Sequence, residues 1–441
     1  MSSLRQGQAV PPFFTGRSSF LQANPYLAQS MLHAAGRCEI QSSEDIYDAN
    51  GVMLWARQRR IGPELMAKLA DRRLLKPIEL SVTALDPVST LALASSLDSL
   101  CEQSPDFALL LSPCRGELIE MLTQLALNPQ EQLLLSVLRF GECDRLTHSL
   151  AVAVTAVIAS RWLDLGPHQQ HQVLRAGLLH DVGQLYLPDS RTRAQAEFVH
   201  HRHPLIGAQC VAELARSGPT IADLIAQSHE RLNGQGFPKG LRGAQLGKPA
   251  QAVAFAEAVA AHLSQIGMGA LRAAISARVV PGEFAEELID GISSLAKSAS
   301  IGPSCQVPTL PPERVGWAMG HLHSELSRVV VLLSMTFGEP DPVREAAQVW
   351  LELVEPLMRA FRCAGIEDAL AQGLEVRPEN PVEHSELAAL YEEVETRVRK
   401  LMRNIDFRCT LSAPLADSRL VHETRRLLLS ACSRPNMPRN T

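Results

Sequence analysis

A histidine and an aspartate stand side by side at the end of an apolar stretch, and this pair constrains the fold most. His180 and Asp181 follow the apolar residues 176–179 and precede Val182. An imidazole and a carboxylate are costly to bury unless something binds them, and a divalent metal ion binds both. The pair predicts either a metal site between helices or a hydrogen-bonded core feature, and on its own it favours the second.

Further histidines favour the metal site. Of the 14 histidines in the chain, nine fall between residues 148 and 262. His148 opens the apolar run 151–159, His203 precedes Pro204 in an expected turn, and His229 precedes a loop with glycines and a proline. Neighbouring helix residues differ by about 100° in direction, so other helices must complete any shell that His180 and Asp181 begin. We expect several helices that carry one or two ligands each.

The order and residue content of these motifs resemble those of the HD superfamily of metal-dependent phosphohydrolases, and within it the HD-GYP branch. The resemblance runs from about residue 148 to 262 in four motifs. It implies a mainly α fold, an HD-type helical bundle around metal ions, and hydrolysis of the bacterial messenger cyclic di-GMP. It also implies a set of metal ligands, with the last two available for a second ion: His148, His180, Asp181, Glu257, His203 and His229.

The sequence departs from the pattern of the branch at four positions. Gln184 stands where the family usually has a lysine that faces phosphate, and Ser228 replaces a histidine. A neutral amide stabilises phosphate less than a cation does, and a hydroxyl binds metals poorly. Asn233 and Phe237 replace an aspartate and a tyrosine in a loop that keeps its glycines and proline. We therefore expect one divalent ion, Fe, Mn or similar, rather than two.

The resemblance also implies roles around the ion. It places catalytic functions on Asp181, Gln184 and Arg231, and ligand binding on the loop residues Asn233, Gly236, Phe237 and Pro238. Two functions stay open. In the first, a metal-activated water hydrolyses a phosphodiester of the cyclic di-GMP class, and the intact His-Asp pair favours it. In the second, the four departures leave a catalytically inactive receptor or scaffold whose C-terminal helices engage a signalling protein.

Composition limits the partners. A net charge of −5 and a pI near 6.3 give no electrostatic footprint for nucleic acid. We find no apolar run near the ~20 residues needed to span a bilayer, and no signal peptide. Nine scattered cysteines without Cys-x-x-Cys spacing are typical of a reducing compartment. We expect a bacterial protein of the cytoplasm that binds a cyclic dinucleotide or another phosphodiester small molecule.

The chain divides into four expected parts. Residues 1–40 are expected to be loosely ordered, and 41–135 to form a β-hairpin at 48–51 followed by helices. This strand-strand-helix unit resembles a small module that often precedes HD-GYP domains. Residues 136–300 are the expected HD-GYP-like domain. Residues 301–441 begin with a Pro-rich linker. They contain expected helices at 313–337, 343–364 and 382–404, a charged and solvated face near residues 392–400, and a disordered tail.

Overall fold

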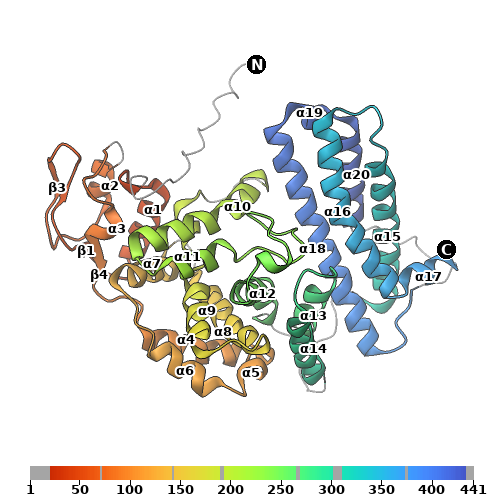
Figure 1. The fold of residues 1–441 in the computed structure, drawn as a ribbon, viewed down its shortest axis with the longest axis horizontal. Helices are drawn as coiled ribbons and strands as arrows, with labels where there is room; N and C mark the ends of the chain where they lie inside the picture. Colours follow the sequence, from red (N-terminus) through yellow and green to blue (C-terminus); the bar gives the residue numbers. More distant parts are fainter. Residues whose placement is uncertain are drawn as a thin grey trace.

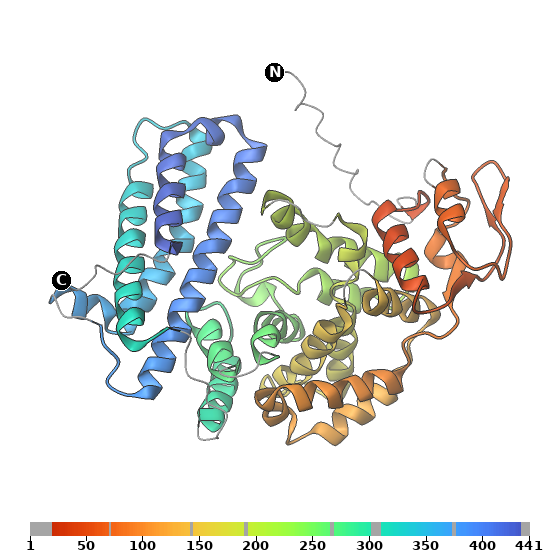
Figure 2. The same cartoon turned by 180° about the vertical axis from the view of Figure 1, so that it is seen from behind.

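We analysed a computed structural model of the chain. The structure describes residues 20–69, 72–141, 144–188, 193–264, 269–300, 310–372 and 376–433. The described residues are mainly helical, and their apolar side chains form two hydrophobic cores. Figures 1 and 2 show the N-terminal module at one end, a central group of helices, and a bundle of long helices at the other end. The mainly α fold with short N-terminal strands is confirmed.

The N-terminal module contains two small antiparallel sheets. β1 (Ile40–Ser42) pairs with β4 (Val82–Ala84), and β2 (Ile46–Tyr47) pairs with β3 (Met53–Trp55). Between β2 and β3, the Asp48 carboxylate accepts the backbone N–H groups of Asn50 and Val52, and Gly51 has a φ of 81°. The predicted hairpin at 48–51 is therefore confirmed. The helices α2 (Pro63–Leu69) and α3 (Ile78–Ser81) complete the module.

One helix lies where a loosely ordered segment was expected. α1 (Pro25–Ala35) begins after Asn24, whose side chain accepts the N–H groups of Tyr26 and Leu27. Its Leu27 and Met31 side chains belong to the first core. The expectation is wrong for this part because a capped helix with an apolar face buries enough surface to be ordered. Residues 1–19 lie outside the described residues.

Two further groups of helices contribute to the first core. The expected helical region over 91–140 consists of α4 (Thr90–Gln103), α5 (Pro105–Leu111), α6 (Arg115–Thr123) and α7 (Pro129–Phe140). The central group follows: α8 (Leu146–Trp162), α9 (Pro167–Leu179), α10 (Arg193–Cys210), α11 (Pro219–Ala226), α12 (Lys248–Leu263), α13 (Gly269–Arg278) and α14 (Glu286–Ser300). Short helical turns, η2 (Val182–Tyr186), η3 (Val211–Ala215) and η4 (Gly243–Gln245), connect them.

α8 is the central helix of this group. Every residue from Ser149 to Ser160 is buried, and α8 packs against both α9 and α12. Gly177 of α9 allows the close approach, because a Cβ atom there would lie 2.5 Å from the Cα of Ala153. Three helices therefore meet tightly, and His148, His180 and Glu257 lie on them or at their ends.

The second core belongs to a C-terminal bundle. Its long helices α15 (Pro312–Ser334), α16 (Asp341–Cys363), α18 (Pro381–Leu411) and α20 (Arg419–Cys432) lie side by side in both views (Figures 1 and 2). The short helices α17 (Ile366–Ala371) and α19 (Ala413–Asp417) join them. Three of the long helices match the expected segments, whereas α20 was not predicted. Most of the expected linker (301–309) and nearly all of the expected tail (434–441) lie outside the described residues. None of the described helices is long and apolar enough to cross a membrane.

A buried carboxyl group links the N-terminal module to the central helices. The Tyr186 hydroxyl donates to Oε1 of Glu79 at 2.9 Å, while Oε2 of Glu79 has no hydrogen-bond partner among the described residues. Burial raises the pKa of the Glu79 carboxyl to about 7 from an ordinary 4.5. Folding therefore favours the protonated acid.

We expect Glu79→Gln to stabilise the protein at high pH. As pH rises from 4.5 towards 7, Glu79 ionises in the unfolded chain before it does in the folded one, so the wild type loses stability over this window. Above that window the glutamine variant should exceed the wild type by about 3 kcal/mol in free energy of unfolding, and below about pH 4 the two should agree. Urea denaturation at both pH values measures this difference. Glu64→Gln, a change at an exposed carboxyl of the same module, should show no such pH dependence, and an equal gain for Glu79→Gln at both pH values would disprove the mechanism.

Candidate metal centre

The structure brings all six predicted ligands together. His148 comes from the first turn of α8, and His180 and Asp181 from the end of α9. His203 comes from α10, His229 from the segment after α11, and Glu257 from α12. These elements are far apart in sequence and pack around one point in the central group of helices.

Three of these side chains form the tightest cluster. Nε2 of His148 lies 3.2 Å from Oε2 of Glu257, and Nε2 of His180 lies 3.3 Å from the same oxygen. The ligand atoms of these three residues all lie within 4.8 Å of one another. Oδ1 of Asp181 is 3.4 Å from Nε2 of His180 and adds a second carboxylate. Two imidazoles and two carboxylates are a donor set for a divalent transition metal.

His180 gives the clearest sign that an ion fits this cluster. Its side chain is fully buried, and Nδ1 donates to the backbone oxygen of Gly177 at 2.8 Å. Because Nδ1 donates to this oxygen, Nε2 is the ring nitrogen that faces the carboxylates of Asp181 and Glu257. Nε2 has no hydrogen-bond partner among the described residues. A buried ring nitrogen with carboxylate neighbours, on an imidazole whose other nitrogen is fixed by a backbone oxygen, is oriented as a metal ligand is.

The charges of the cluster stabilise one another. Burial disfavours the protonated imidazole, but the carboxylates of Asp181 and Glu257 outweigh it and raise the pKa of His180 to about 9. Burial would likewise raise the pKa of Glu257, yet His148 and His180 hold it well below its usual value. The site is thus built to hold positive charge, as a proton or as a metal ion, and the two compete.

Gln184 holds Asp181 in place. Its Nε2 donates to Oδ1 of Asp181 at 2.6 Å, and its Oε1 accepts from the guanidinium of Arg145. Both ends of the amide are therefore engaged within the protein. The sequence predicted a catalytic Gln184, and the geometry favours a positioning residue instead, with Arg145 as the nearby cation that sequence reasoning missed.

His203 and His229 form the other half of the cluster. Their Nε2 atoms lie 3.0 Å apart, and Nε2 of His203 lies 3.4 Å from Oδ1 of Asp181. The expected turn at His203 and Pro204 is wrong, because α10 continues through this proline and buries Cys210. Ser228 is buried and donates to the backbone oxygen of Ile225 at 2.9 Å, so its hydroxyl is used elsewhere.

The loop after His229 is shaped by buried charges. The Glu230 carboxylate accepts the N–H groups of Lys239 and Leu241, which ties both ends of the loop together. A Cβ atom at Gly236 would lie 2.4 Å from the Arg231 nitrogen, so only glycine fits there. The Phe237 ring stacks on His229, with centroids 4.7 Å apart. Pro238 follows through a cis peptide bond.

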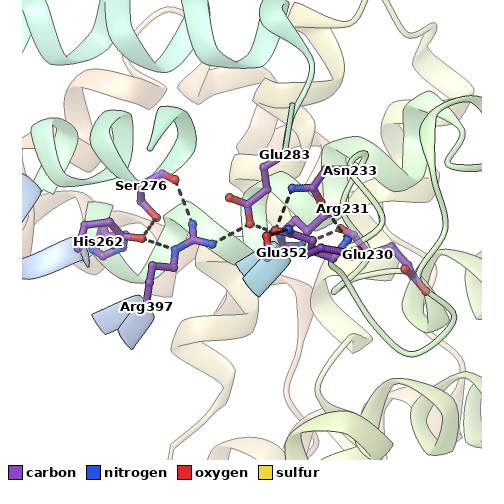
Figure 3. Close-up of polar contacts among 10 residues, drawn as sticks. Glu230, Arg231, Asn233, His262, Ser276, Glu283, Glu352 and Arg397 are labelled. Atoms are coloured by element: carbon purple, nitrogen blue, oxygen red, sulfur yellow. Dashed lines mark hydrogen bonds and ion pairs between the residues drawn. The ribbon is translucent and has the colours of Figure 1, made fainter. Parts of the chain in front are cut away.

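Arg231, for which the sequence predicted a catalytic role, is paired next to the C-terminal bundle. Its Nε lies 3.2 Å from Oε1 of Glu283, and Arg397 of α18 contacts the same oxygen at 2.9 Å (Figure 3). Arg397 also pairs with Glu393 at 2.7 Å. Glu393 and Arg397 were expected on a solvated face. That expectation is wrong for them, because α18 packs these charges against α13, but right for Arg399, which is exposed.

A small-to-large change at Gly183 should disturb the cluster. A Cβ atom there would lie 2.0 Å from the backbone oxygen of His203 and 2.6 Å from the nitrogen of Gly207. We expect Gly183→Ala to push α10 and His203 away from Asp181, with a loss of about 3 kcal/mol in free energy of unfolding. Urea denaturation measures the loss. Gly166→Ala is the matched control, since no atom lies within 4 Å of its Cβ position, and equal stability of the two variants would refute the close-packing argument.

Comparisons with known proteins show what this chain is similar to. Residues 145–262 match the family model of the HD domain. A cyclic di-GMP phosphodiesterase of Pseudomonas aeruginosa is 31% identical over 121 residues, which cover 26% of this chain and 29% of that protein. A 3'3'-cGAMP-specific phosphodiesterase of Vibrio cholerae is 25% identical over 115 residues, which cover 25% of this chain and 27% of that protein.

Two further similarities complete the comparison. The cyclic di-GMP phosphodiesterase response regulator RpfG of Xanthomonas campestris is 30% identical over 169 residues, covering 33% of this chain and 45% of that protein. The chain therefore spans less than half the length of the curated relatives it matches. The structural match to a solved HDG"Y"P protein of Bdellovibrio bacteriovorus covers 61% of this chain and 97% of that protein's chain. The two sequences are 19% identical, and the TM-score of 0.32 is too low to support the fold assignment.

Proposed function

Residues 145–262 belong to the HD superfamily of metal-dependent phosphohydrolases, in its HD-GYP branch, and from that premise we propose that this protein hydrolyses a phosphodiester of the cyclic di-GMP class. The observation that carries the proposal is the buried Nε2 of His180, which has no hydrogen-bond partner among the described residues and faces two carboxylates. A hydrogen-bonded core pair would leave no such nitrogen unsatisfied.

We propose that one divalent ion, Fe, Mn or similar, is held by His148, His180, Asp181 and Glu257. The mixed nitrogen and oxygen donors support these metals. When bound, such an ion supplies water activation and neutralises charge on the phosphate. His203 and His229 would hold a weaker second ion or the other side of the phosphate. The engaged hydroxyl of Ser228 supports a single tight site.

The remaining residues have supporting roles in this proposal. Gln184 fixes the orientation of the Asp181 carboxylate, and Arg145 adds positive charge behind it. Asn233, Gly236, Phe237 and Pro238 shape the wall that receives the ligand. Arg231 stays next to this wall, where Glu283 holds its guanidinium. A rigid set of positioned groups lowers the cost of organising the reaction.

The relatives support the substrate class. Proteins named as phosphodiesterases of cyclic di-GMP and of 3'3'-cGAMP are among the relatives of this chain. The free cysteines Cys38, Cys101, Cys114 and Cys210 are buried and fit the reducing cytoplasm that we propose as the location. A receptor or scaffold that binds the messenger without cleaving it, with a signalling protein on the C-terminal helices, is the alternative that the following experiment tests.

The test is turnover of cyclic di-GMP by purified protein supplied with manganese or ferrous iron. Chromatography follows the linear dinucleotide, and Asp181→Ala serves as the control. Product that depends on Asp181 supports the hydrolase. If folded, metal-loaded protein binds cyclic di-GMP but forms no product, the proposal of hydrolysis is wrong and the receptor stands.

A further inference from the structure

A cavity lies between the loop after His229 and the C-terminal bundle. Its volume is about 350 Å³, within the lower range of small-molecule pockets. The loop contributes His229, Phe237 and Arg242, and α16 and α18 contribute the opposite wall. Nothing in the proposed hydrolytic chemistry uses this opposite wall.

The cavity carries an excess of positive charge. Five cationic side chains line it against two carboxylates, Glu283 and Glu352. Glu283 is already shared by the guanidinium groups of Arg231 and Arg397 (Figure 3). The other cations of the lining are Arg242, Lys400 and Arg408, of which the last two come from α18. Cations clustered in a concave, partly apolar site attract an anionic ligand, and they do so most strongly when it bears phosphate.

The same cavity has an apolar side. Leu353 and Leu357 of α16 and Leu401 of α18 line it. Phe237 stacks on His229 and also lies against His201, with ring centroids 4.5 Å apart. Aromatic and aliphatic surfaces next to cations suit a nucleotide, whose base is flat and whose phosphate is charged.

Fixed contacts hold the two walls together. Nε2 of Gln235 in the loop donates to the backbone oxygen of Glu352 in α16 at 2.6 Å. On the other side, Arg397 of α18 donates to the backbone oxygen of Ser276 at 3.2 Å as well as to Glu283. The cavity is therefore formed by both parts of the protein, and the C-terminal bundle supplies half of it.

Its position relates it to the metal centre. His229 lines the cavity, and its Nε2 lies 3.0 Å from Nε2 of His203 and 3.9 Å from Oε1 of Glu257. A ligand with one phosphate at the metal centre could thus place its remaining part in the cavity. We propose that the cavity binds the distal nucleotide of a phosphodiester ligand, with Lys400 and Arg408 of the C-terminal bundle contacting its phosphate. This inference rests on the proposed function for the identity of the ligand.

The experiment measures binding of cyclic di-GMP apart from its cleavage. Calorimetric titration uses the full chain carrying Asp181→Ala, so that the ligand is not consumed. Adding Lys400→Ala and Arg408→Ala should weaken binding about 10- to 100-fold, as expected for loss of hydrogen bonds to charged groups. Arg399→Ala is the matched control, because Arg399 is the neighbour of Lys400 on α18 but is exposed and outside the cavity lining; it should leave the affinity unchanged.

A second double variant controls for misfolding. Lys400→Gln with Arg408→Gln keeps long polar side chains and removes only the charges, and circular dichroism checks that each protein is folded. Unchanged affinity in both folded double variants would overturn the inference, while turnover by the otherwise unmodified chain would leave the proposed function standing. Binding that depends on Lys400 and Arg408 without any turnover would support the cavity and refute hydrolysis. Absence of any binding both by the Asp181→Ala parent and by the metal-loaded wild type would refute the cavity as a site for this ligand.

Discussion

Replacing His180 by alanine is expected to lower the affinity for manganese or ferrous iron at least about 100-fold, because removal of outer partners of a metal ligand alone costs 10- to 100-fold. His180 contributes a buried Nε2 that faces Asp181 and Glu257. Without this imidazole, the two carboxylates have one ligand fewer to hold the metal ion with them. Turnover should therefore fall as metal occupancy falls. Metal content by mass spectrometry and calorimetric metal titration measure the change.

Two variants serve as controls for His180→Ala. His171→Ala removes an exposed histidine outside the cluster and should keep full metal affinity. Ser228→Ala should also keep it, because that hydroxyl is bonded to the backbone oxygen of Ile225. Full metal occupancy in a folded His180→Ala protein would show that the ion does not bind where we place it. A loss of metal in Ser228→Ala would instead show that the serine is a ligand.

The residues of the cluster could be predicted because short motifs stand in the order that the HD-GYP branch shows. The pair of His180 and Asp181 alone favours a core feature, and the full ligand set, with Glu257, is what the resemblance implies. The hairpin at 48–51 could be predicted because an Asn-Gly pair is a local signal. Such features depend on residues close together in the chain.

Features that depend on distant residues could not be predicted in this way. Arg145 meets Gln184, and Glu283 meets Arg397, which is 114 residues further along the chain. Around position 397 the sequence pattern is that of a solvated helix with i,i+4 pairs, and only the packing of α18 on α13 buries it. Pro204 suggested a turn, but it lies inside α10, because tertiary packing outweighs the local preference of proline for a turn. The cavity could not be predicted from the sequence either, because its walls come from separate parts of the chain.

The buried charges that join the two parts of the protein lead to the second large expected effect. Glu283 is nearly inaccessible, and one of its oxygens accepts from both Arg231 and Arg397. Burial opposes its ionisation, but the two guanidinium groups outweigh burial and lower the pKa of Glu283. The carboxylate is therefore charged in the folded protein, where it is the counter-charge of buried Arg231 and shares the partly buried Arg397 with Glu393.

Glu283→Gln should cost about 3–5 kcal/mol in free energy of unfolding, because it leaves the buried Arg231 guanidinium without its counter-charge and removes one of the two carboxylates beside Arg397. Urea denaturation measures the loss, and limited proteolysis shows whether the C-terminal bundle separates first. Glu395→Ala is the matched control, since Glu395 pairs with the exposed Arg399 on the same helix and should cost less than about 1 kcal/mol. Adding Arg231→Met to Glu283→Gln should recover part of the loss, because it removes the buried guanidinium that Glu283 balances. Equal, small costs for Glu283→Gln and Glu395→Ala would mean that these charges do not hold the bundle against the central helices. The cavity between them would then lack a rigid second wall.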